Sequence, residues 1–114
     1  MGDAAKKHRW VFGADVSDIN LGGGVTRRVL AHGPEAMCAT HYFEKGAIVA
    51  LHSHPHTQIT YVAEGVFEFT VDGESKVVKK GDSILKQDSV PHCATCLEKG
   101  VLIDFFTPMR EDFV

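Results

Sequence analysis

The chain has 114 residues, which is enough for one domain with one hydrophobic core. Its 12 basic and 15 acidic side chains give a formal net charge of −3 without a long run of either sign, which argues against a nucleic-acid partner. No apolar stretch is long enough for a signal peptide or a membrane span, so we expect a cytoplasmic protein with no membrane partner. Three cysteines are too few for a disulfide framework and agree with a reducing compartment.

Residues 1–24 are predicted to form an N-terminal strand or arm of a single domain that covers residues 1–114. The arm carries Trp10, Val11 and Phe12, which have no assured place in a small core. It ends in three consecutive glycines at 22–24. No lysine–serine pair or strong helix follows them, so a flexible turn is favoured over a phosphate-binding loop.

The rest of the chain is predicted to be β-structure, because no segment has a convincing amphipathic helical pattern. In residues 66–72, apolar and polar side chains alternate, and Asp72-Gly73 then supplies the turn of a hairpin. Short strands separated by glycine-containing turns are typical of a sandwich or a closed barrel. The predicted strands cover residues 25–31, 36–43, 47–53, 58–63, 66–72, 75–78, 83–86, 92–97 and 101–106.

Three histidines and one amide are candidate metal ligands. His52 and His54 are two residues apart, so in a strand they project to the same side and can approach one ion together. Pro55 allows a turn that delivers Gln58 from the neighbouring strand, and His92 comes from a remote strand. A barrel brings such inward-facing residues together, because its interior collects side chains from strands distant in sequence.

The other histidines are not expected to be metal ligands. His56 lies in the predicted turn between His54 and Gln58, where we expect it at the rim of the site. We expect His8, His32 and His41 to be either exposed or hydrogen-bonded in the core, which are the ordinary situations for this residue type.

With these residues the chain resembles the cupin superfamily. The first cupin motif has a glycine, His-x-His, an acidic position and a second glycine; the matching residues here are Gly46, His52, His54, Gln58 and Gly65. In the second motif Gly81 and His92 match, whereas Gln87, Ser89 and Cys96 depart from the usual proline, glycine and asparagine. The resemblance implies an all-β, single-domain cupin, a double-stranded β-helix or jelly-roll barrel, with its two motifs in residues 46–96 and a bound metal.

Gln58 replaces the glutamate that is usual at its position in the first motif. With three neutral imidazoles and an amide as ligands, a divalent ion keeps its full formal charge, which favours an anionic substrate or a polarised oxygen. The site also lacks the two-histidine, one-carboxylate triad of many iron oxygenases, although three-histidine oxygenases keep that chemistry open. Nickel, zinc, iron, manganese and copper all accept imidazole, so the sequence predicts one divalent transition metal without selecting it.

A single carboxylate interrupts the last apolar strand, residues 101–106. Alternation places Leu102, Asp104 and Phe106 on one face, and burying an unpaired charge is costly. One interpretation is an ion pair between Asp104 and Arg110 that fastens the C-terminal tail. The functional interpretation makes Asp104 an acid/base group and Arg110 a clamp for a carboxylate, because guanidinium binds carboxylates bidentately.

The combined pattern is similar to the small cupins of pectin and alginate breakdown, from about residue 25 to the end. This resemblance implies conversion of 4,5-unsaturated monouronates to linear keto-uronates, with a small anionic sugar acid as substrate and a homodimeric assembly. It implies His52, His54, Gln58 and His92 as metal ligands, and a catalytic group of Asp104, Phe106 and Arg110. Two alternatives stay open, a non-catalytic metal-containing cupin that binds a small ligand and a cupin dioxygenase.

Overall fold

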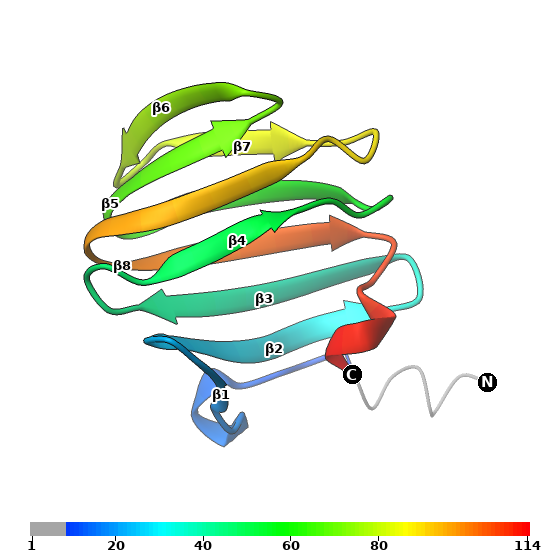
Figure 1. Cartoon of the computed structure of the whole chain (residues 1–114). Helices are drawn as coiled ribbons and strands as arrows, with labels where there is room; N and C mark the ends of the chain where they lie inside the picture. The colour runs from blue at the N-terminus through cyan, green and yellow to red at the C-terminus, as the bar shows by residue number, and fades with distance from the viewer. Residues whose placement is uncertain (1–8) are drawn as a thin grey trace.

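The computed structural model of the protein describes residues 9–114, which form an antiparallel β-structure that curls into two layers (Figure 1). Two short 3₁₀ helices flank the strands, η1 (Gly13–Asp15) and η2 (Glu111–Phe113). The strands are β1 (Ile19–Gly22), β2 (Val25–Gly33), β3 (Ala36–Phe43), β4 (Ile48–His52), β5 (Thr57–Val71), β6 (Glu74–Lys79), β7 (Ser83–Lys86) and β8 (His92–Thr107). The first eight residues of the predicted arm, His8 included, lie outside the described residues, and within 9–114 no helix is long and apolar enough to cross a membrane.

Two long strands, β5 and β8, belong to both layers. The second half of β8, from residue 100 onward, pairs with β3 and with the first half of β5. Its first half pairs with β4 and with the second half of β5. The strands β1, β2, β3 and β7 therefore extend one layer, and β4 and β6 extend the other. This is the jelly-roll arrangement that the motif pattern predicts.

The long strands cross between the layers where Gly65 of β5 meets Gly100 of β8. Gly65 has a φ of +86°, and a Cβ atom there would lie 2.5 Å from the Cα of Gly100. Before this point Gln58, Thr60 and Val62 are the buried residues of β5, and after it Phe67 and Phe69 are. The predicted break between strands 58–63 and 66–72 is thus a shift of pairing within one continuous strand.

The hydrophobic core fills the end of the barrel near this crossing. Phe67 is fully buried and meets the ring of Phe43 edge-on, with 5.2 Å between ring centroids. Burying one such aromatic side chain contributes about 1.5–3 kcal/mol to the stability of the fold. The predicted hairpin is confirmed as well, because Asp72 and Gly73 form the turn between β5 and β6 with φ values of 50° and 79°. The other end of the barrel is left for polar residues.

Candidate metal centre and cavity

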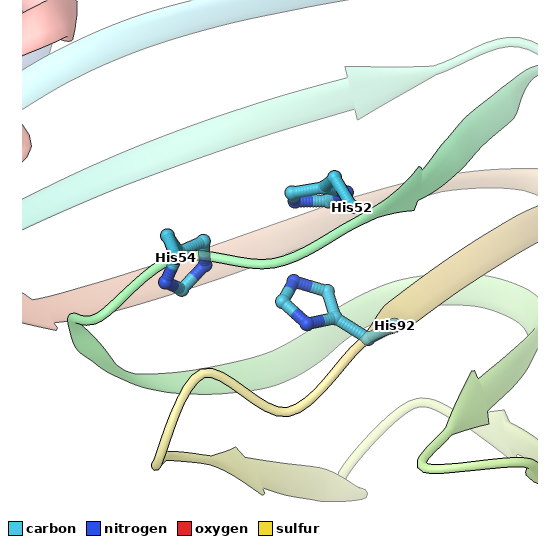
Figure 2. Close-up of side chains that lie close together, drawn as sticks. All are labelled: His52, His54 and His92. Carbon is cyan, nitrogen blue, oxygen red and sulfur yellow. The ribbon is translucent and has the colours of Figure 1, made fainter.

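Three of the four predicted metal ligands meet at this polar end. His52 is the last residue of β4 and lies directly opposite His92, the first residue of β8. The ring centroids of His52 and His92 are 4.3 Å apart, and those of His54 and His92 are 5.0 Å apart (Figure 2). We expected His54 to follow His52 on one extended strand, but β4 ends at His52 and His54 lies in the loop beyond it. The loop nevertheless brings one nitrogen of each ring within 4.8 Å of the others.

The hydrogen bonds of these rings leave lone pairs free for an ion. The Nδ1 atoms of His52 and His92 donate to the carbonyls of Ala50 and Val90, at 2.8 and 2.9 Å, so in the neutral ring the lone pair is on Nε2. The Nε2 of His92 is buried without a protein partner. Burial lowers the pKa of His92 to about 4, so the ring is neutral at pH 7. Neutral, convergent imidazoles of this kind suit a divalent transition metal.

Gln58 connects the histidines to the buried acid. Its Oε1 accepts a hydrogen bond from the Nε2 of His54 at 2.9 Å, and its Nε2 donates to the Oδ1 of Asp104 at 2.8 Å. A glutamate at this position would offer Asp104 a second carboxylate in place of a donor. The presence of an amide rather than an acid at position 58 therefore has a local physical reason.

Asp104 is a fully buried carboxylate with a complete set of donors. Besides Gln58, it accepts hydrogen bonds from the hydroxyl of Thr60 at 2.6 Å and from the Nδ1 of His41 at 2.7 Å. Burial alone would raise the pKa of Asp104, but the hydrogen bond from His41, together with the charge of Lys86 and the hydrogen bond from Thr60, outweighs it and holds that pKa below its usual value. Asp104 is therefore ionised at pH 7.

His41 is a member of this network that the sequence interpretation did not identify. Its Nε2 accepts a hydrogen bond from the Nε of Arg27 at 3.0 Å, while its Nδ1 donates to Asp104. This arrangement requires the neutral tautomer with the proton on Nδ1. Alternation in the predicted strand 36–43 could have revealed it, because His41 shares the inward face with Met37, Ala39 and Phe43.

Arg110 does not form the ion pair with Asp104 that we considered. Its Nε and Nη2 instead donate to the two carboxylate oxygens of Asp112, at 3.0 and 2.9 Å. The guanidinium also lies over the ring of Phe113, 4.4 Å from the centroid, and over that of Phe106 at 5.4 Å. Since guanidinium has five N–H donors, three remain for a ligand. The C-terminal tail contacts the barrel through its aromatic ring instead, because Phe113 packs edge-on against Phe106 and lies under the guanidinium of Arg27.

A cavity of about 330 Å³ joins these groups, at the lower end of the ~300–1,000 Å³ typical of ligand pockets. Its wall contains Asp104, Phe106 and two of the three histidines, together with Arg110 from the tail. Arg27 and Lys86 also line it, and neither was identified from the sequence. The cationic side chains of the wall are Arg27, Lys86 and Arg110, and the carboxylates are Asp104 and Asp112. The surplus of one positive charge is suited to a small anion.

Comparison with known proteins agrees with this architecture. The family described as the cupin domain matches residues 39–105. Over 96 residues, 82% of this chain and 87% of the relative, the sequence is 41% identical to the pectin degradation protein KdgF of Dickeya dadantii (strain 3937). An RmlC-like cupin from Shewanella frigidimarina NCIMB 400 superposes with a TM-score of 0.90 at 42% identity, covering 93% of this chain and 96% of the other. KdgF from Halomonas sp. superposes with a TM-score of 0.88 at 31% identity, covering 92% and 97%.

Proposed function

The chain belongs to the cupin domain family, and we propose that it converts 4,5-unsaturated monouronates, products of pectin or alginate breakdown, to linear keto-uronates. The observation that carries this proposal is an ionised, buried Asp104 beside three convergent histidines, in a cavity whose wall also holds Arg110. Support also comes from the relatives, two of which are KdgF proteins, one of them described as a pectin degradation protein.

The chemistry needs only proton movements within one sugar. An unsaturated monouronate is a cyclic enol ether with a hemiacetal hydroxyl on the other side of the ring oxygen. Opening the ring removes the hydroxyl proton, breaks the bond between the hemiacetal carbon and the ring oxygen, and adds a proton to the alkene carbon. Atoms and electrons balance without an oxidant or a second substrate.

Each catalytic residue has a separate task in this reaction. Arg110 holds the substrate carboxylate with the N–H groups that Asp112 leaves free, and Phe106 forms an apolar wall against the ring. Asp104 accepts and returns the proton, because it is ionised at pH 7 and its donors fix the direction of its oxygens. His52, His54, His92 and Gln58 would hold the divalent metal, which supplies Lewis-acid polarisation of a substrate oxygen.

A spectroscopic assay tests this function. The enol-ether absorbance of unsaturated galacturonate or mannuronate-derived monomer is followed with protein as purified, with chelator-treated protein and without protein. We expect acceleration by the purified protein, loss of that acceleration with chelator, and a rate at least about 100-fold lower for Asp104→Asn. Asp88→Asn, at an exposed turn residue, is the matched control.

Different outcomes separate the alternatives. No acceleration by the purified protein, together with an Asp104→Asn variant that behaves identically, would exclude the isomerase. Thermal stabilisation by the monomer without any product would identify a ligand-binding cupin. Oxygen consumption with the monomer would identify a dioxygenase.

A homodimer in the cytoplasm is part of the same proposal. The side chains of Trp10 and Phe12 are 73% and 65% exposed, which supports their burial against a second copy. Cys38, Cys93 and Cys96 are all free thiols, which agrees with a reducing compartment. Mass measurement in solution tests the assembly, and a monomer at micromolar concentration would contradict it.

A further inference from the structure

Lys86 is a buried cation that the proposed mechanism does not use. Lys86 is the last residue of β7 and lines the cavity, and only 3% of its surface is exposed. Its ammonium lies 4.8 Å from the centroid of the Phe69 ring, which comes from the second half of β5 in the other layer. In the ladder it is directly opposite Gln58, and Gln58 in turn is opposite Phe106 of β8. Lys86, Gln58 and Phe106 therefore form one row across the cavity face of three strands.

The ammonium of Lys86 has no protein acceptor within the described part of the chain, residues 9–114. None of its hydrogen-bond donors is paired there, and no carboxylate lies within ion-pair distance of it. An ammonium carries three donors and no acceptor, and burying it without partners is costly. The contact with Phe69 offsets part of that cost, because a cation over an aromatic face is favourable. The nitrogen of Lys86 is not among the fully buried polar atoms without a partner, so it is accessible from the cavity, where oxygens of a ligand can accept its hydrogen bonds in place of water.

The position of Lys86 decides which part of a ligand it meets. Adjacent strands are about 4.8 Å apart, so β7 lies roughly 10 Å from β8, with β5 between them. Arg110 lies over Phe106, at the β8 end of the row, and Lys86 lies at the β7 end. Strands at this separation leave room for a six-membered ring with one carboxylate between the two side chains. If Arg110 holds the carboxylate, the opposite end of the ring faces Lys86.

On the basis of the proposed function, we propose that Lys86 is a second anchoring group, whose ammonium donates hydrogen bonds to the hydroxyl oxygens at the end of the sugar acid opposite its carboxylate. It makes the cavity selective for polyhydroxylated acids over apolar acids of the same shape. Arg110 recognises the charge that both kinds of acid share. Lys86 recognises the oxygens that only the sugar carries.

The test compares two probes that the proposed reaction does not consume. D-galacturonate has the ring, the carboxylate and the hydroxyls, whereas cyclohexanecarboxylate has the ring and the carboxylate alone. Affinities are measured by calorimetry for the purified wild-type protein, for Lys86→Met and for Lys80→Met, which alters an exposed lysine. We expect Lys86→Met to bind galacturonate about 10- to 100-fold more weakly, the effect of one hydrogen bond to a charged group. Its affinity for cyclohexanecarboxylate should fall by a smaller factor, because this probe loses only the long-range attraction of the ammonium and no hydrogen bond. Lys80→Met should match the wild type.

Folding of the variant is measured in parallel. Methionine has a similar length and removes a buried charge, so the melting temperature of Lys86→Met should equal or exceed that of the wild type. If this variant does not fold, Lys86→Gln replaces it, because its amide keeps donors without the charge and should retain part of the selectivity. Equal losses for both probes, or no loss for galacturonate, would overturn the inference.

The outcome is separable from the proposed reaction. A protein that discriminates the two probes through Lys86 but does not turn over unsaturated monomer would retain the anchoring role and lose the isomerase function. A protein that turns the monomer over at the same rate and KM with and without Lys86, and whose galacturonate affinity is unchanged, would retain the function and lose the anchor.

Discussion

Replacing Gln58 by glutamate should destabilise the metal-free protein, although glutamate is the usual residue at this cupin position. The Nε2 atom of Gln58 donates to Asp104 Oδ1 at 2.8 Å. In Gln58→Glu an acceptor would occupy that position, facing a carboxylate that is buried and ionised. At an effective dielectric constant of about 20, two charges at this separation repel by about 6 kcal/mol.

Protonation limits the cost of this repulsion. The new glutamate can take up a proton and donate it to Asp104, and at pH 7 this costs about 4 kcal/mol relative to an ordinary glutamate pKa of about 4.3. The folded pKa of the pair is thus raised above its unfolded value, so the variant is close to the wild type near pH 4.5 and loses stability as pH rises. We expect a deficit of about 3–4 kcal/mol in the free energy of unfolding at pH 7.

Chemical denaturation of chelator-treated protein at pH 4.5, 5.5, 6.5 and 7 measures this deficit. Gln58→Met is the control, because it removes the donor without adding a carboxylate and its deficit should change little with pH in this range. A Gln58→Glu variant as stable as the wild type at pH 7, or a deficit independent of pH, would refute the reasoning. Adding a divalent metal should reduce the deficit, because the ion's charge opposes the added carboxylate.

Three further changes should have distinct effects. Added zinc should stabilise the wild type against heat by about 2.7 kcal/mol at 100 times its Kd, and His92→Ala should lose this shift in calorimetry; an equal shift would mean that the ion binds elsewhere. His41→Leu leaves a buried oxygen of Asp104 without its donor and should cost about 1–3 kcal/mol in urea denaturation, whereas His41→Asn keeps an N–H in place and should recover part of the loss. Gly65→Ala should cost about 3 kcal/mol or more, because its φ is +86° and the backbone of Gly100 occupies the space; a cost below about 1 kcal/mol would show that the crossing can relax.

Local patterning was sufficient for most strands but not for the crossing between layers. The alternation of 66–72 correctly predicts Phe67 and Phe69 inside. Gly65 indicates a special backbone position, yet a glycine alone does not distinguish the end of a strand from a shift within one, and that choice depends on the contact with Gly100. The strand Ile19–Gly22 lies within the N-terminal strand or arm predicted for residues 1–24, but four residues are too few for a pattern to define its bounds.

The spacing of the histidines in the sequence was enough to predict which of them meet, but it did not predict the hydrogen-bond partners of Asp104. The sequence indicated that a lone carboxylate in an apolar strand needs compensation, and the next cation after it in the chain was Arg110. In the structure the compensation comes from neighbouring strands, through His41 on β3 and Thr60 on β5. Pairing of this kind depends on strand order and register, which sequence distance does not contain. Lys86 is buried for the same reason, because its place opposite Gln58 is set by the β5–β7 ladder.

Some residues of the cavity wall belong to paired strands and others to the segment after the last strand, and this difference affects how such a protein can evolve. His92 and Asp104 are part of the strand ladders, so substitutions near them disturb the barrel itself. Arg110, Asp112 and Phe113 lie after the last strand, in a segment that contacts the barrel through a few side chains rather than through a strand ladder. Substitutions in that short tail can change which acid the cavity binds without disturbing the pairing of any strand. Ligand preference can therefore diverge between descendants faster than the ion-binding end of the barrel.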